Sequence, residues 1–599
     1  GSAGGGLRGD AVRGVLDALA GRRVLLVLDN FESVLPDGAG FVSRLLAQAP
    51  EVVCVVTSRA LLLLSAERRF DVSPLSLPGP YADEDEVRAA DAVALFCARA
   101  RAARPDFDPC AEDDLRLLAD VCRRLDGLPL ALELAAARLR HLSLAELSER
   151  LRDAFAVLTT RLRDVPRRHR TLQGTLEWSY DLLDDDEKRM LRAVSIFAGG
   201  FSGRAAEAVS GESEALDLLA SLEDKSLVVC RAEDAGASRF HLLNLVDEFA
   251  AHKLREAGEE ETARAAHARW FAALAAEKGA AARTPDEVAA FDVLEAEMDN
   301  LRAAFAYLRD HTPEQLPEYV AALADFLRRR GYAHERREWP KTALEVIEVG
   351  KASPSDLTHS RLHQARSVYL RDIGDILVAR NAALRALELG KRARDPWTIA
   401  EALNALGLLE LRAGSHADAQ SMLEEARSCY RRSNRNWGEA IPLNNLGTLA
   451  YSQADMDAAY TYFHQSAILC RQSGDRHSLA HALNGLGITA LAQGNFDEAI
   501  TLLSEYKELC LIQKDHVAAA IALLNLGDAM RETGNVHAAL PLLIASERVL
   551  ERLGHRHKSE ASSRIALCIP TVGQERVHSL AKQLNKKSLT ELLATEPTS

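Results

Sequence analysis

The stretch Ala402-Leu403-Asn404-Ala405-Leu406-Gly407 decides the fold of this chain, because closely similar stretches follow at intervals of 40 residues. The later copies read Pro-Leu-Asn-Asn-Leu-Gly at 442–447, Ala-Leu-Asn-Gly-Leu-Gly at 482–487 and Ala-Leu-Leu-Asn-Leu-Gly at 522–527. Two further columns with the same period hold only alanine, at 400, 440, 480 and 520 and at 419, 459, 499 and 539. A period of roughly 34–47 residues with helical patterning predicts an α-solenoid built from helix pairs.

The small residues of the repeat have a mechanical explanation. Glycine on the first helix and alanine on the second are expected where neighbouring helices cross too closely for a larger side chain. One period earlier, Gly374 and Ala379 match Gly414 and Ala419, so a fifth, less regular unit precedes the four clear ones. Residues 360–555 resemble the tetratricopeptide repeat, in the slightly longer form found beside bacterial regulatory ATPase modules.

Composition places the repeats in a larger, mainly α-helical protein. A length of 599 residues predicts about three to six domains, and 47% hydrophobic with only 5% aromatic residues favours helix-on-helix packing. The net charge of −14 disfavours sequence-independent binding to nucleic acid or to an anionic membrane. Nine cysteines without a C-x-x-C pair, no membrane-spanning stretch and no signal peptide predict a cytoplasmic protein with reduced thiols.

The N-terminal part has the pattern of a parallel α/β unit. Two unbroken apolar runs, Val24–Leu28 and Val52–Val56, flank a segment of helical spacing at 40–49. Runs that are apolar on both faces predict strands of a covered parallel sheet. Asp29 follows the first run and Thr57-Ser58-Arg59 the second, at the edge where open α/β sheets bind their ligands.

Beyond residue 80 the pattern becomes helical. The clearest amphipathic stretches are 91–103, 112–125 and 130–139. Residues 170–255 then combine helices with a β-hairpin predicted around 225–229 and 239–242, which is the outline of a winged helix.

The ordered set of motifs resembles one signalling family. Leu-Val-Leu-Asp-Asn-Phe-Glu at 26–32, Thr-Ser-Arg at 57–59 and Gly-Leu-Pro-Leu at 127–130 look like the NB-ARC class of STAND signal-transduction ATPases. The stretch from Trp178 to Phe201 is similar to the winged-helix part of the bacterial members, and 294–302 resembles their connector into the repeats. Within that class, the chain resembles the antibiotic-regulator and LuxR-like transcriptional regulators.

The resemblance implies a switch that uses ATP and ADP with Mg²⁺. Asp29 would be the acid associated with Mg²⁺, and Asn30 stands where vigorous ATPases have a second acid, so hydrolysis would be slow at most. Thr57 and Arg59 would end the sensor strand, with Arg59 contacting phosphate. Pro129 would pack on the adenine, and Gly127 would belong to the same nucleotide site. A protein or peptide partner would bind the concave face of the repeats, the activated form would oligomerise, and DNA would be contacted only through a separate effector domain.

Two departures limit what this chain does alone. The family's phosphate loop needs a lysine one strand before Asp29, whereas the first lysine of the sequence is Lys188. The glycines at 1 and 6 have the loop's spacing, but Leu7 and Arg8 replace its lysine and hydroxyl residue. Leu242-Leu243-Asn244 also replaces the Met-His-Asp triplet that contacts ADP in many members. We therefore expect no catalytic residue here and little or no nucleotide binding by this chain alone.

Three functional hypotheses remain at this stage. The first is a regulatory module whose phosphate loop and effector lie in a missing N-terminal part; the second is a tetratricopeptide scaffold that binds no nucleotide; the third is a winged-helix DNA binder. The expected domains are a partial nucleotide-binding domain (1–78), a helical domain with the Gly-Leu-Pro-Leu motif (79–160), a winged helix (161–258), a helical connector (259–355), the solenoid (356–560) and a helical tail (561–599).

Overall fold

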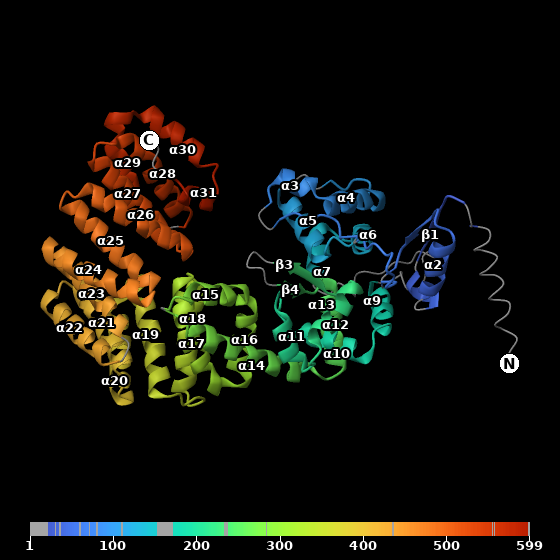
Figure 1. The fold of residues 1–599 in the computed structure, drawn as a ribbon, viewed down its shortest axis with the longest axis horizontal. Helices are drawn as coiled ribbons and strands as arrows, with labels where there is room; N and C mark the ends of the chain where they lie inside the picture. Colours follow the sequence, from blue (N-terminus) through green and yellow to red (C-terminus); the bar gives the residue numbers. More distant parts are fainter. Residues whose placement is uncertain are drawn as a thin grey trace. The chain divides into compact units, whose positions relative to one another are not determined.

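The computed structural model confirms a mainly α-helical chain that ends in an α-solenoid (Figure 1). It divides into two compact units, residues 1–270 and 271–599. The finer division into six domains stays a prediction. Among the described residues, none of the helices has both the length and the apolar character that crossing a membrane requires. The described residues are 19, 22–29, 31–34, 37–58, 61–70, 72–79, 82–108, 112–151, 172–232, 238–282, 284–433, 436–553, 555 and 557–596.

The first unit begins with the predicted β-α-β arrangement. Strands β1 (Val24–Leu28) and β2 (Val52–Val56) pair in parallel, and α2 (Asp37–Gln48) connects them after the short helix η1 (Phe31–Val34). One face of this sheet packs on α2, through a small core around Leu45 and Val52. Because successive side chains of a strand point to opposite faces, every second side chain faces α2 and the sheet has one buried face.

The other face of the sheet corrects the prediction of a sheet covered on both faces. Leu25, Val27, Val53 and Val55 are 64%, 59%, 60% and 47% exposed. The strand register sets Leu25 opposite Val53 and Val27 opposite Val55, so the four side chains form one apolar patch. The described part of the chain supplies a helix for one face only, although the residues on both faces suit burial.

The helical part of the first unit follows the predicted amphipathic stretches within one residue. Its core is built from alanine, leucine and the edge-to-face pair of Phe96 and Phe107. The helices are α3 (Glu84–Ala89), α4 (Asp91–Ala103), α5 (Glu112–Arg124), α6 (Pro129–Arg138) and α7 (Leu144–Arg150). Capping boxes at Asp83 and Ser143 fix the starts of α3 and α7, because each side chain and its partner glutamate satisfy free backbone N–H groups.

The predicted hairpin closes a second group of helices in this unit. Strands β3 (Val229–Ala232) and β4 (Ser238–His241) pair antiparallel, and Phe201 extends the pairing by a bridge to Phe240. The surrounding helices are α9 (Leu172–Asp181), α10 (Asp185–Val194), α11 (Gly203–Ser210), α12 (Ala215–Asp224), α13 (Asn244–Glu256) and α14 (Glu260–Gly279), the last of which runs past the unit boundary. The winged-helix assignment itself stays a prediction.

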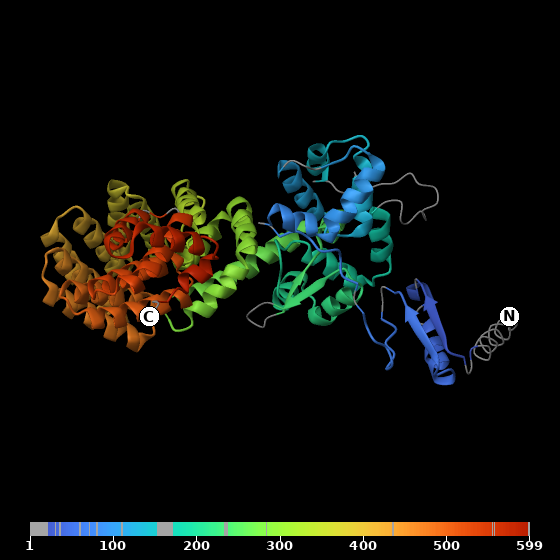
Figure 2. The same ribbon diagram turned by 90° about the horizontal axis from the view of Figure 1, so that it is seen from above.

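The second unit starts with a helical connector and continues as stacked hairpins (Figures 1 and 2). The connector contains α15 (Glu287–Ala296), α16 (Met298–His311), η4 (Pro313–Gln315), α17 (Leu316–Arg329) and α18 (Ala333–Glu348). The hairpins pair α19 (Asp356–Ile373) with α20 (Ile376–Ala393), α21 (Pro396–Arg412) with α22 (His416–Arg432), α23 (Ala440–Ser452) with α24 (Met456–Ser473), α25 (Arg476–Ala492) with α26 (Phe496–Ile512), and α27 (His516–Glu532) with α28 (Val536–Arg552). The short helix η5 (Asn436–Glu439) precedes α23, and α29 (Lys558–Val572), α30 (Gln574–Leu584) and α31 (Leu589–Leu593) follow the last hairpin.

The packing of the hairpins follows the repeat pattern, and capping residues fix the helix starts. A β-carbon on Gly447 would lie 2.8 Å from the ring of Phe463, and one on Gly487 would lie 2.6 Å from Leu503. These glycines therefore allow the two helices of a hairpin to touch, as expected. Aspartate or asparagine before a helix caps it, and the Asp395 carboxylate accepts a 2.8 Å bond from the Thr398 N–H.

Candidate functional site

The structure brings together two of the residues predicted to form a nucleotide site. Leu28 and Val56 are paired at the ends of β1 and β2, so Asp29 and Thr57 leave the sheet side by side. The Thr57 hydroxyl donates a hydrogen bond to Asp29 Oδ1. The Thr57 N–H donates to the Leu28 carbonyl at 2.9 Å, and the Phe31 N–H donates to the Thr57 carbonyl at 3.0 Å. Both side chains are exposed, so this edge presents an oriented carboxylate to solvent.

Two other predicted site residues, Asn30 and Arg59, lie outside the described residues. Their predicted roles beside phosphate therefore stay predictions. Of the remaining pair, Gly127 lies on the turn between α5 and α6, and Pro129 is the first residue of α6. Among the described residues, no hydrogen bond or ion pair joins either of them to Asp29.

Packing explains the glycine of the Gly-Leu-Pro-Leu motif. Gly127 has φ +65°, and a β-carbon there would lie 2.4 Å from the carbonyl oxygen of Leu75. The Leu75 N–H donates to the Gly127 carbonyl at 3.1 Å, which fastens the extended segment before α3 to this turn. Pro129 is exposed and occupies the first turn of α6, where its missing N–H costs nothing.

The described residues fit only the metal side of a nucleotide site. The carboxylate of Asp29 is a suitable oxygen ligand for Mg²⁺, and Thr57 orients it. A phosphate loop needs a lysine whose positive charge binds the phosphates. The sequence has no lysine before Lys188. Among the described residues, no group of three or more His, Cys, Asp and Glu side chains could hold a metal ion.

A contact that the sequence analysis did not predict joins the Gly127 turn to α13. Asp126 precedes Gly127 and has φ +53°. Its carboxylate accepts a 2.8 Å bond from the Asn244 side-chain amide and a 3.2 Å bond from the Leu245 N–H. The Asn244 amide also donates to the Arg123 carbonyl at 3.1 Å. Asp126 thus caps a helix that begins 118 residues later in the chain.

Asp247 lies one turn into α13 and faces the same carboxylate. Its Oδ1 atom is buried and has no hydrogen-bond partner among the described residues. Burial, together with the charges of Asp126 and Glu248, raises the pKa of Asp247 to about 7. Burial also raises the pKa of Asp126 to about 6, against the lowering effect of the hydrogen bonds from Leu245 and Asn244 and of the Arg231 charge. The Asp126 carboxylate therefore contributes to the raised pKa of Asp247.

The repeats carry a second candidate surface, which we call the asparagine row. The Asn445 amide donates to Asn404 Oδ1 at 2.6 Å, and the Asn525 amide donates to Asn484 Oδ1 at 2.8 Å. All four residues lie on first helices of their hairpins and are half-buried. Because an amide group both donates and accepts hydrogen bonds, this row could bind the main chain of a polypeptide.

Comparisons with known proteins support the repeat assignment and point to regulation. Residues 438–511 match the tetratricopeptide repeat family. A protein of Mycobacterium tuberculosis that is named as an HTH-type transcriptional regulator is 32% identical over 418 residues, which cover 67% of this chain and 46% of that protein. The regulatory protein AfsR of Streptomyces griseus is 27% identical over 438 residues, covering 68% of this chain and 42% of AfsR.

The chain thus spans less than half the length of these relatives and is similar to bacterial regulatory proteins. Among solved structures, a STAND protein with a tetratricopeptide repeat sensor from Pyrococcus horikoshii is 12% identical, with 96% of this chain and 85% of that chain covered. Its TM-score of 0.39 is too low for the likeness to bear on function.

Proposed function

We propose that this chain is a STAND-type regulatory module, in which a nucleotide-dependent switch is coupled to a tetratricopeptide region that binds a polypeptide partner. The observation that carries the proposal is the edge formed by β1 and β2, where Asp29 and Thr57 are hydrogen-bonded at the carboxyl ends of paired parallel strands. Similarity to bacterial regulatory proteins supports the same proposal.

In this proposal the chain supplies only part of the nucleotide site. Asp29 would hold Mg²⁺, Arg59 would contact phosphate, and Pro129 would pack on the adenine beside Gly127. The group that grips the phosphates would come from residues outside this chain, because the sequence has no lysine before Lys188. The bound nucleotide would set the state of the switch, with slow hydrolysis at most.

The exposed apolar patch on the sheet supports the proposal that further protein covers this face of the sheet. Leu25 and Val53 lie opposite each other on it, and each is about three-fifths exposed, at 64% and 60%. Parallel sheets occur almost only with both faces covered. Leaving the aliphatic side chains of the second face in water would cost free energy. A covering segment that also carries a phosphate loop would complete both the sheet and the nucleotide site.

The repeats would form the sensor side of the module. Stacked helix pairs present a long surface on which an extended partner can lie. The asparagine row lies on such a surface and offers main-chain hydrogen bonding at 404, 445, 484 and 525. Through these bonds a partner would be held by its backbone, while the side chains nearby would select its sequence.

Calorimetry with Mg·ATP and Mg·ADP tests the switch. We expect no measurable binding to this chain and clear binding to a chain extended upstream by a segment that carries a phosphate loop. Absence of binding to both forms would exclude a nucleotide-dependent switch.

The second candidate function is a scaffold that binds partners and no nucleotide, and the missing lysine favours it. A truncation that begins near residue 355 separates the two. If the repeats alone capture the same partners with the same affinity as the extended chain, regardless of nucleotide, the scaffold is correct. If capture needs the first unit and nucleotide, the hypothesis of a nucleotide-dependent switch is supported.

A further inference from the structure

In the second unit, the last described residues fold back onto the repeats and reach Lys507, which lies 89 residues earlier than Glu596 in the chain. We call residues 588–596 the closing segment; it contains the short helix α31, which packs against α27 and α28 (Figure 1). Leu592 and Leu593 are 0% and 1% exposed and belong to the hydrophobic core of the repeats. Three residues after them, the Glu596 carboxylate lies 2.5 Å from Lys507 Nζ.

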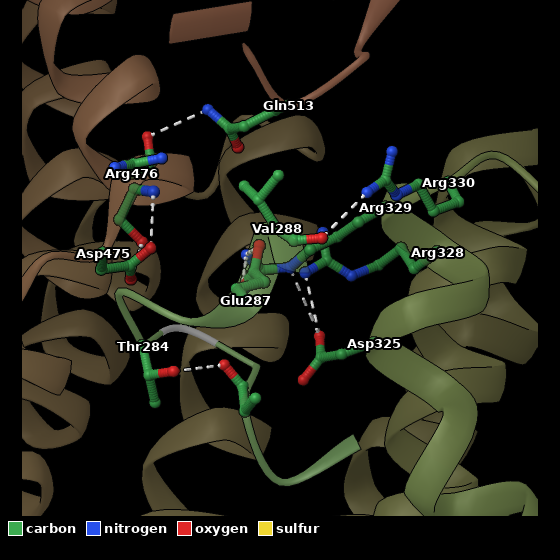
Figure 3. Close-up of polar contacts among 12 residues, drawn as sticks. Thr284, Glu287, Val288, Asp325, Arg328, Arg329, Arg330, Asp475, Arg476 and Gln513 are labelled. Carbon is green, nitrogen blue, oxygen red and sulfur yellow. Dashed lines mark hydrogen bonds and ion pairs between the residues drawn. The ribbon is translucent and has the colours of Figure 1, made fainter. Parts of the chain in front are cut away.

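The two partners of this ion pair differ in burial. The Lys507 side chain is 6% exposed, whereas the Glu596 side chain is 73% exposed. By contrast, Figure 3 shows Arg329 of α17 beside Glu287 of α15, an ion pair in which the side chains are 5% and 11% exposed. A buried charge that loses its partner is costly. Lys507 therefore needs a carboxylate, and among the described residues it receives one only from the closing segment.

The repeats do not supply a partner for Lys507 as they do for an equivalent arginine. Two periods of 40 residues earlier, Arg427 takes the place of Lys507, and its Nε lies 2.5 Å from the Glu439 carboxylate. At the position that corresponds to Glu439, two periods later, the chain has Ala519. Covering the end of a solenoid explains the buried leucines of the closing segment, but it does not require a buried lysine on α26.

The closing segment is attached through few contacts. The helix α31 has only five residues, and the preceding helix α30 buries only Leu584. Arg552 donates hydrogen bonds to the carbonyls of Asn585 and Lys587 at 3.0 and 2.8 Å. Thr595 Oγ1 is buried and has no hydrogen-bond partner among the described residues. Because a buried hydroxyl without a hydrogen bond costs free energy, the closing segment fits its site imperfectly, and a better-matched segment can replace it.

We propose that the surface of α27 and α28, with Lys507 of α26, is a binding site for a partner polypeptide that carries two adjacent leucines and a carboxylate three residues after them, and that the closing segment occupies this site as an internal ligand. The site is distinct from the asparagine row, whose residues lie on first helices, because Lys507 lies on a second helix. That the occupant belongs to another protein rests on the proposed function. The exchange of the closing segment for a free peptide does not, so the two can fail separately.

The test asks whether a free peptide of the same sequence takes the place of the closing segment. The probe is a fluorescein-labelled peptide of residues 586–596 with an amidated end, so that its carboxylates are side chains only. In the full chain, Leu592→Ser combined with Leu593→Ser gives the opened variant, in which the closing segment has lost its buried side chains. Leu553→Ser combined with Leu567→Ser is the matched control, because these leucines are 41% and 55% exposed.

Fluorescence anisotropy measures the affinity of each full chain for the peptide. The opened variant should bind it at least about tenfold more tightly than the parent and the control do, because an occupied site lowers the apparent affinity in proportion to its vacant fraction. If circular dichroism shows that the opened variant is unfolded, Glu596→Lys decides instead, since it keeps both leucines and should also increase the affinity. Glu575→Lys, on an exposed position of α30, controls for its charge. A folded variant that binds no more tightly than the parent would overturn the proposal.

A double-mutant cycle tests the role of Lys507. Lys507→Met in the opened variant and Glu596→Gln in the peptide should each weaken binding about fivefold. Together they should weaken it no more than either change alone, because both remove the same ion pair. Glu591→Gln in the peptide is the control and should have little effect, since Glu591 bonds to Ser588 of its own segment. Additive losses in the cycle, or carbodiimide cross-links between Lys507 and Glu596 of two different copies of the parent, would overturn the internal ligand.

Discussion

Asp126 caps the helix α13 by accepting a 3.2 Å hydrogen bond from the backbone N–H of Leu245. The cap comes from the turn that carries the Gly-Leu-Pro-Leu motif, whereas helices usually receive their caps from the residue just before them. The start of α13 is therefore tied to the position of this turn.

Removing that cap should loosen the first turn of α13. Asp126→Ala leaves the Leu245 N–H without its acceptor and leaves the Asn244 amide with the Arg123 carbonyl alone, at a cost of about 1–2 kcal/mol. Backbone amide exchange in the first turn of α13 should then become about tenfold faster. Asp120→Ala serves as the control, because the contacts of Asp120 among the described residues are ion pairs with Arg123 and Arg124 on the surface of α5. Equal exchange in both variants would contradict the role of the cap.

The carboxyl of Asp247 should make stability fall as pH rises. Its pKa of about 7 lies above the ordinary 3.8, so this contribution to stability is complete below pH 4 and lost as pH rises through 7. Asp247→Asn carries no ionisable group and should be more stable than the parent at pH 8, by roughly 3 kcal/mol. Near pH 4 the difference should vanish.

Urea unfolding of both proteins between pH 4 and pH 8 measures this dependence. The exposed Asp217→Asn on α12 is the control and should show no such trend. A stability difference between Asp247→Asn and the parent that stays constant with pH would contradict the burial of this carboxyl.

A single methyl group should disrupt the repeat packing at Gly487. In an open helix, replacing glycine by alanine stabilises by roughly 0.5–1 kcal/mol. At Gly487 the added β-carbon would lie 2.6 Å from Leu503, so Gly487→Ala should destabilise the second unit by about 1–3 kcal/mol. Gly40→Ala on α2 has nothing within 4 Å of the β-carbon and should not destabilise. Opposite shifts in the thermal unfolding midpoints would confirm the contrast, and a stabilised Gly487→Ala would refute it.

A substitution on the exposed face of the sheet should reduce stability only in an extended chain, where further protein covers that face. Val53 is 60% exposed, so Val53→Lys should change the stability of this chain by less than about 0.5 kcal/mol. In the chain extended upstream, the same change should reduce stability severely. Val52→Lys, at a residue that is 3% exposed, should be severe in both forms. If Val53→Lys is harmless in the extended chain as well, nothing covers this face.

The sequence predicts the local elements of this chain well, because they follow from short-range patterns. The helix predicted at 91–103 has these bounds in the structure, and the helix predicted at 130–139 is shifted by one residue. The 40-residue period likewise predicts the hairpins and their glycine contacts. The edge with Asp29 and Thr57 follows from parallel strands that end together.

The contacts that tie these elements together were not predicted. Asp126 and Asn244 are 118 residues apart, and Lys514 and Asp292 are 222 residues apart. No sequence period relates them, because the curvature of the solenoid and the docking of whole helices bring them together. The one local sequence feature that pointed to the Asp126 contact was an aspartate directly before Gly127. In the structure, Asp126 has a left-handed backbone and its carboxylate bonds to α13.

The most direct test of the proposed switch is calorimetric titration of Mg·ADP into the chain extended upstream and into its Asp29→Asn variant. Asp29 is exposed, and its loss should leave the fold intact. The account predicts binding by the extended parent and at least about tenfold weaker binding by the variant, which lacks the Mg²⁺ carboxylate. Equal affinities for the two proteins, or no binding by the extended parent, would contradict it.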